Sequence, residues 1–97
     1  MTDLTIANTI KFQLGVKALY MMGAKYFTGD YDSLSFKICA SKKVSNIKIK
    51  LEGDDTYTMT FYKISKLKVK IIDIIKDVYF DNLLNLISII CEIDVKI

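Results

Sequence analysis

The chain has 97 residues, of which 52% are hydrophobic and 26% are charged. Disordered segments combine low hydrophobicity with high net charge, so this composition predicts a folded protein, and the absence of a Pro-, Ser- or Gly-rich divider predicts one domain over residues 1–97. The sequence contains no histidine, which excludes a His-based catalytic triad, a His general base and a His-ligated metal centre.

The net charge is +3, and it is unevenly distributed along the chain. Residues 37–70 contain nine lysines and three acids, whereas residues 71–97 contain two lysines and five acids. Arginine is absent, so bidentate recognition of phosphate or guanine is not indicated. Lysine, isoleucine, asparagine and tyrosine also have AT-rich codons, so genome composition is an alternative source of the lysine excess.

The N-terminal segment has the pattern of an amphipathic helix. Thr2 or Asp3 can cap it, and apolar residues recur at helical spacing from Ile6 to Leu14. Gly15 supplies a C-terminal stop. The short apolar stretch 17–22, which Gly23 ends, suits either a strand or more helix, and we predict a strand.

The middle of the chain alternates with the period of a β-strand. After a polar turn at 28–33, residues 34–40 place Leu34, Phe36, Ile38 and Ala40 on one face, and residues 47–51 repeat the pattern. Residues 52–55 form a hairpin turn, and a third strand follows over 56–62. We therefore predict an antiparallel meander.

The last third is less clearly patterned. Residues 66–72 alternate, but the run of isoleucines that follows breaks the pattern, so 64–75 is left open between strand and helix. Asp77 or Asp81 can cap a final helix, whose apolar stripe is formed by Leu83, Leu86, Ile87 and Ile90. The predicted fold class is α+β, with an N-terminal helix, an antiparallel β-meander of three to four strands and a C-terminal helix, both helices packed on one sheet face.

No chemical motif for catalysis is present. The glycines are isolated, so neither a dinucleotide fingerprint nor a phosphate loop is formed, and we expect no cofactor. The acidic turns at 30–32 and 52–55 lack the spacing of a calcium loop, so we expect no metal site. Cys39 and Cys91 are far apart in sequence and are expected to be reduced thiols. We expect the protein not to be an enzyme.

Lysines of the predicted sheet are the first candidate binding residues. They would share or border the face opposite the core, with Tyr62 nearby, and would present a positive platform to a nucleic-acid backbone. An exposed sheet face must in any case be polar, and lysines on edge strands guard against aggregation, so a purely structural role is the alternative. The candidates are Lys37, Lys48, Lys50, Lys63, Lys66, Lys68 and Lys70.

Three stretches of the first third resemble a known family. Residues 6–10 (IANTI), 13–15 (QLG) and 21–27 (MMGAKYF) are similar to the opening "IAxTIxxQLGG…MTGAK" of a family of small phage and prophage proteins. Val16 and Met22 depart from that pattern at the second glycine and at the threonine. The resemblance implies an origin in a mobile element and action in the cytoplasm of a bacterial host, and it carries no agreed activity.

The same motif supplies the second candidate site. Its glycines and Lys25 can simply shape a connection between elements. Alternatively, a loop over 22–27 presents Lys25, Tyr26 and Phe27 to a partner, a composition suited to interface anchors.

Two functions follow from these features. The first is a protein-binding inhibitor from a phage or mobile element, which blocks a host protein or ribonucleoprotein complex of the CRISPR type by occupying its surface. The alternative is a lysine-rich nucleic-acid-binding accessory protein of phage replication or recombination.

The N-terminus lacks a secretory pattern, and the most apolar C-terminal run is too short to span a bilayer, so we expect neither export nor a membrane partner. A chain of this length is also compatible with a homodimer.

Overall fold

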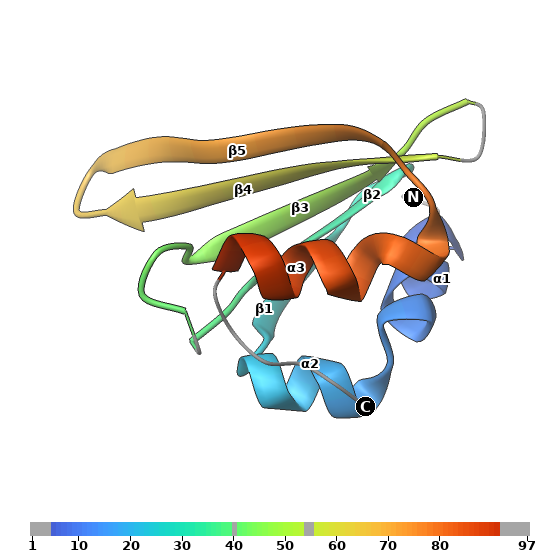
Figure 1. Ribbon diagram of the computed structural model, residues 1–97, viewed down its shortest axis with the longest axis horizontal. Helices are drawn as coiled ribbons and strands as arrows, with labels where there is room; N and C mark the ends of the chain where they lie inside the picture. Colours follow the sequence, from blue (N-terminus) through green and yellow to red (C-terminus); the bar gives the residue numbers. More distant parts are fainter. Residues whose placement is uncertain (1–4, 40, 54–55, 92–97) are drawn as a thin grey trace.

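The structure is a computed structural model and describes residues 5–39, 41–53 and 56–91. Within these ranges, five strands form one antiparallel sheet in the order β1-β2-β3-β4-β5, and the helices lie on one side of it (Figure 1). The elements are α1 (Thr5–Leu14), α2 (Val16–Met22), β1 (Lys25–Gly29), β2 (Ser33–Lys37), β3 (Asn46–Leu51), β4 (Tyr57–Ser65), β5 (Lys68–Val78), the 3₁₀-helix η1 (Phe80–Asn82) and α3 (Leu83–Cys91).

The predicted α+β class is confirmed, but the sheet has five strands in the described residues rather than three to four. Each strand pairs with the next one along the chain, so the sheet is a simple meander. The two additional strands come from residues 25–29, predicted as a loop followed by a turn, and from the segment left open between strand and helix.

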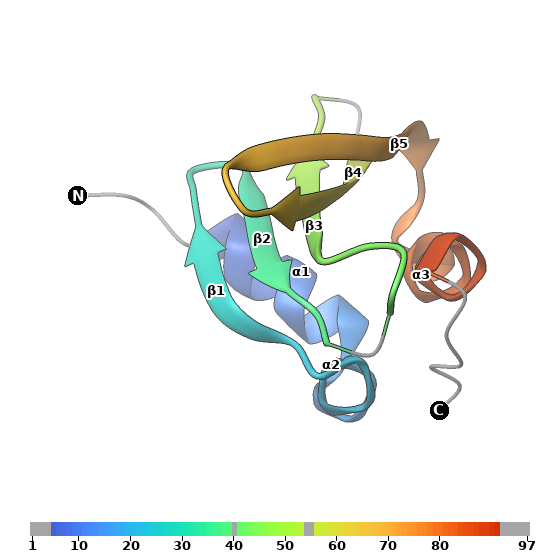
Figure 2. The ribbon, with the colours of Figure 1, turned by 90° about the vertical axis from the view of Figure 1, so that its left-hand side faces the viewer.

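The core lies between one sheet face and the helices. Leu34, Phe36 and Ile38 are buried as predicted, while Ala40 lies outside the described residues. Figure 2 shows α1 beneath the β1 and β2 side of the sheet and α3 at the β5 side. The largest fully buried side chains come from both layers: Phe36, Phe61, Ile10, Leu14, Met22, Ile47, Ile49, Met59, Leu83 and Ile87.

The prediction of a strand over 17–22 is wrong, because α2 occupies these residues. Ala, Leu, Lys and Met are strong helix formers, and helical geometry buries Ala18, Leu19 and Met22 together on one face. Gly15 ends α1, and its N–H donates to the Lys11 carbonyl at 3.1 Å. It has φ of 89°, a conformation that lets the chain turn and start α2 at once.

The open segment is strand β5, and a bulge explains its broken pattern. Tyr62 pairs with Ile71, whereas Phe61 pairs with Asp73, so Ile72 is an extra residue on β5. Beyond it, Ile74 pairs with Thr60 on the outer face and Ile75 with Met59 on the core face. The consecutive isoleucines are therefore a strand whose alternation shifts by one residue at Ile72.

The predicted C-terminal helix is confirmed as α3. Leu83 and Ile87 are buried, and Leu86 and Ile90 pack partly against the core. The two predicted caps are wrong: Asp77 lies in β5, and Asp81 lies inside the 3₁₀-helix η1 that precedes α3.

Gly23 closes α2 and gives a test of the fold. It has φ of 67° and ψ of 36°, and its N–H donates to the Tyr20 carbonyl. A Cβ at this position would lie 3.0 Å from the Cβ of Cys39. Gly23→Ala should lower the free energy of unfolding by about 1–3 kcal/mol. The added Cβ makes the left-handed backbone conformation unfavourable and also lies too close to Cys39. Urea unfolding followed by circular dichroism measures this loss.

Gly53→Ala is the matched control, because an added Cβ there meets nothing within 4 Å. It should change the free energy of unfolding by less than about 0.5 kcal/mol. Equal urea midpoints for Gly23→Ala and the wild type would contradict the assigned cap.

Candidate functional site

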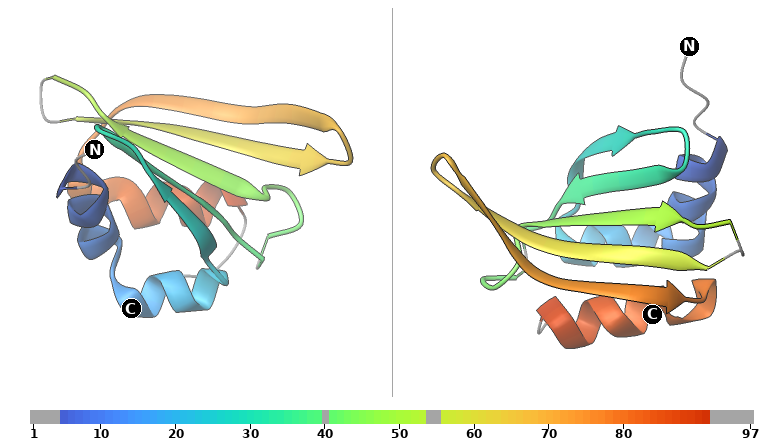
Figure 3. Two further views of the ribbon diagram at one scale, coloured as in Figure 1. Left: turned by 180° about the vertical axis from the view of Figure 1, so that it is seen from behind. Right: turned by 90° about the horizontal axis from the view of Figure 1, so that it is seen from above.

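The face of the sheet opposite the helices, here called the outer face, is covered by no helix of the described residues (Figure 3). Register places three of the predicted lysines on it. Lys48 lies between Ser35 and Thr60, and Lys50 lies between Ser33 and Thr58. Their direct neighbours on both sides are therefore uncharged hydroxyl side chains.

Lys37 continues the same face at the other end of β2. It pairs with Asn46, which in turn pairs with Tyr62 of β4. The Tyr62 side chain is half-buried, and burial raises the pKa of its hydroxyl. The strands β2, β3 and β4 contain no acidic residue, so the middle of the outer face carries only positive charge.

The other predicted lysines do not join this face. Lys63 pairs with Lys70, one residue out of phase with Tyr62 and Ile71, so alternation turns both to the helix side. Lys68 follows the same phase, opposite Ser65. The predicted basic face is thus split between the two sides of the sheet.

Lys66 lies in the turn between β4 and β5 and has φ of 55°. This left-handed conformation is unfavourable for a side chain with a Cβ and is the usual place for glycine or asparagine in a two-residue hairpin. Lys63 is also engaged, because its Nζ donates to the Lys42 carbonyl at 2.9 Å.

Because Lys68 and Lys70 point to the helix side, the outer face of the β4–β5 ribbon is formed by apolar residues. The pairs Ile64–Val69 and Tyr62–Ile71 occupy it, and all three aliphatic side chains are exposed. Sequence reasoning missed this surface because the segment was undecided between strand and helix. The alternation of lysines with apolar residues over 66–72 could have indicated a strand with one apolar face.

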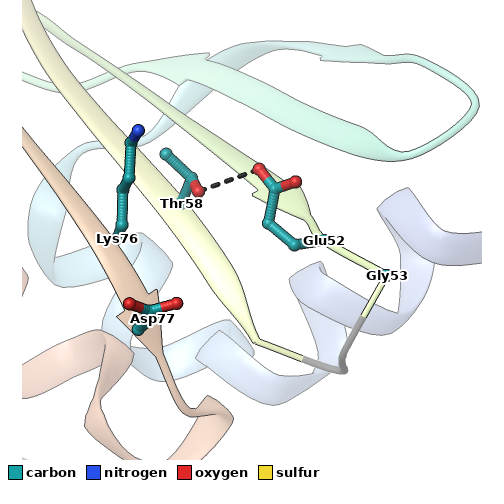
Figure 4. Close-up of a pocket in the computed structure, with 5 residues that line it drawn as sticks. All are labelled: Glu52, Gly53, Thr58, Lys76 and Asp77. Carbon is teal, nitrogen blue, oxygen red and sulfur yellow. Dashed lines mark hydrogen bonds between the residues drawn. The ribbon is translucent and has the colours of Figure 1, made fainter.

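The outer face ends at a shallow hollow of about 420 Å³, lined by Glu52, Gly53, Thr58, Lys76 and Asp77 (Figure 4). The Thr58 hydroxyl donates to Oε1 of Glu52 at 2.9 Å. Two carboxylates against one ammonium make the hollow unsuited to an anion. No group of three or more potential metal ligands exists among the described residues, in this hollow or elsewhere.

The predicted binding loop over 22–27 spans the last residue of α2, the turn at Gly23 and the first half of β1. Tyr26 is 73% exposed and has φ of 57°, and the Lys25 ammonium lies 5.5 Å from its ring centroid. Phe27 instead packs against Phe36 at 5.5 Å between ring centroids, beneath the Lys11 ammonium. Lys25 and Tyr26 are therefore available to a partner, whereas Phe27 belongs to the core layer.

Tyr20 is an exposed aromatic residue that the motif reading missed. It is 85% exposed near the end of α2, and Met21 beside it is partly exposed. With Lys25 and Tyr26, these residues flank the turn at Gly23. The prediction of a strand over 17–22 concealed this side chain, because a strand would have given Tyr20 no special exposure.

Comparisons of the chain with models of protein families, with curated proteins and with solved structures find no match. Among the residues that the structure describes, no helix is both long and apolar enough to cross a membrane.

The two cysteines have opposite environments. Cys39 is exposed two residues after the end of β2, whereas Cys91 is buried at the end of α3. Burial raises the pKa of the Cys91 thiol to about 12, although Lys43 opposes the shift. The Cys91 carbonyl also accepts a hydrogen bond of 2.8 Å from the Ser41 hydroxyl, which ties the end of α3 to the β2–β3 connection.

Thiol labelling tests this arrangement. At pH 8 an aromatic disulfide reagent should modify one thiol per native chain and a second only in denaturant, because Cys91 is both inaccessible and protonated at that pH. Cys39→Ser should abolish the fast reaction. Equal rates for both thiols in the native protein would be inconsistent with a buried Cys91.

Proposed function

We propose that this protein binds nucleic acid through the outer face of its sheet, without sequence specificity and without catalysis. One observation carries the proposal: the three central strands contain lysines and no acids, and no helix of the described residues covers their outer face. Lys37, Lys48 and Lys50 are spread over two adjacent strands, which suits an extended phosphate backbone.

The chemistry of the face sets the expected mode of binding. Lysine ammonium groups act as point charges, and the hydroxyl of Thr60 beside Lys48 offers a further hydrogen bond to phosphate. Binding would gain most of its free energy from the release of counterions. The absence of arginine agrees with contact to the backbone rather than to base edges.

The proposed setting comes from the family resemblance. A phage or prophage protein would act in the cytoplasm of its bacterial host, and an accessory role in replication or recombination fits a small protein without histidine or a phosphate loop. No cofactor is required for this activity.

A salt titration tests the proposal. The wild type should retard single- or double-stranded DNA or RNA at 50 mM salt. Lys48→Ala with Lys50→Ala should weaken binding about tenfold or more and reduce the slope of log K against log salt by about 2, because two phosphate contacts are lost.

Lys17→Ala with Lys42→Ala removes the same charge from exposed positions that lie outside the outer face, on α2 and in the β2–β3 connection. This control should retain most of the affinity. No retardation by the wild type at 50 mM salt, or equal losses in the two double variants, would reject the proposal.

A second candidate function is inhibition of a host defence complex by occupying its surface, as the resemblance to phage proteins suggests. The exposed aromatic residues around Gly23 favour this function, because the side chains of Tyr20 and Tyr26 are largely exposed to solvent. Tyrosine is enriched among the interface residues that contribute most of the binding free energy. Lys25 adds a charge beside them.

Affinity capture from a bacterial host tests this candidate. A tagged wild type should retain a protein or ribonucleoprotein complex that Tyr20→Ala with Tyr26→Ala loses. Tyr31→Ala is the control, because Tyr31 is similarly exposed but lies in the β1–β2 turn. Retention of the same complex by the double variant would count against this surface.

A further inference from the structure

Strand β5 forms one rim of the sheet. It is 11 residues long and pairs only with β4 among the described strands, so no described strand lies along its other edge (Figure 3). Within β5, the Ile74 N–H donates to Oδ1 of Asp73 at 2.9 Å. The opposite rim, β1, has only five residues. Both rims carry a register shift and one non-glycine residue with positive φ, Tyr26 in β1 and Asp77 in β5, so length is what distinguishes them. The long rim is therefore the exposed template for a further strand.

Half of this rim belongs to a ribbon that projects beyond the helices (Figure 1). Residues 63–71 are exposed on both faces, and Leu67 at its tip is completely exposed. Val69 and Ile71 are exposed by 64% and 57%. A two-stranded ribbon with no apolar cover is marginally stable in water, and a third strand would stabilise it.

We propose that a second copy of this chain supplies that strand, by antiparallel pairing of β5 with β5 about a two-fold axis. The first half of β5 contains Lys68 and Lys70 and no acid, whereas the second half contains Asp73 and Asp77 with one lysine, Lys76, so the two halves carry opposite excess charge and complement each other in this orientation. The inference is independent of the proposed nucleic-acid binding.

The bulge at Ile72 selects the register. Before it, Lys68 and Lys70 point to the helix side, and after it Asp73 and Ile75 share that side. Residues paired between strands must point to the same face. Self-pairing within the first half alone would set lysine against lysine, so the first half of one copy pairs with the second half of the other.

Among the registers that satisfy both conditions, one sets opposite charges directly against each other: Lys70 faces Asp73 of the second copy, and Val69 faces its Ile74 on the outer side. The two-fold axis repeats each pair. Opposite charges and apolar residues in direct cross-strand positions each stabilise a sheet. Each projecting ribbon thereby gains a third strand, and the two sheets join into one.

Charge reversal tests the register in the full-length protein. Sedimentation equilibrium should show a wild-type dimer. Lys70→Glu alone should raise the dimer dissociation constant about tenfold or more, because it sets two carboxylates opposite each other at both symmetric positions. Asp73→Lys alone should do the same, and the combination should restore the wild-type constant.

The variants distinguish a loss of dimerisation from a loss of folding. Within the chain Lys70 pairs with Lys63, so Lys70→Glu removes a repulsion and should preserve the fold, which circular dichroism checks. Lys17→Glu on α2 makes the same charge change elsewhere and should leave the dissociation constant unchanged. A wild type that stays monomeric up to millimolar concentration, or a dimer insensitive to both single reversals, would overturn the proposal.

Discussion

The burial of only one face of the sheet is the constraint on which the rest of the structure depends. Two-residue alternation in β2, β3 and β4 separates apolar from polar side chains, and the helices cover the apolar side alone. In a chain of this length, helices on both faces would require a second apolar set that these strands do not contain. The polar outer face is thus a direct result of the pattern that builds the core.

The sequence predicted the elements whose pattern one buried face determines, such as β3 with Ile47 and Ile49 and α3 with Leu83 and Ile87. It did not predict α2, because a seven-residue apolar stretch has similar local preferences in a helix and a strand. Its helical state follows from packing of Ala18 and Met22 in the core, a tertiary effect.

The candidate sites show the same division. Lys48 and Lys50 could be placed from alternation alone, since their strand is regular on both sides. Lys68 and Lys70 could not, because the face that they occupy is determined by a bulge, which has no reliable sequence signature. Phe27 was assigned to a binding loop because its contact with Phe36 depends on how β1 meets β2.

The bulge at Ile72 also partitions charge in space. In a regular strand, the same residues would turn Lys68 and Lys70 to the outer face, which already carries the lysines of β2 and β3, and one broader cationic surface would result. The extra residue instead divides the lysines between two surfaces that face in opposite directions. A single inserted residue thus separates the lysines of the sheet into two smaller groups on opposite sides, which lowers the repulsion among them.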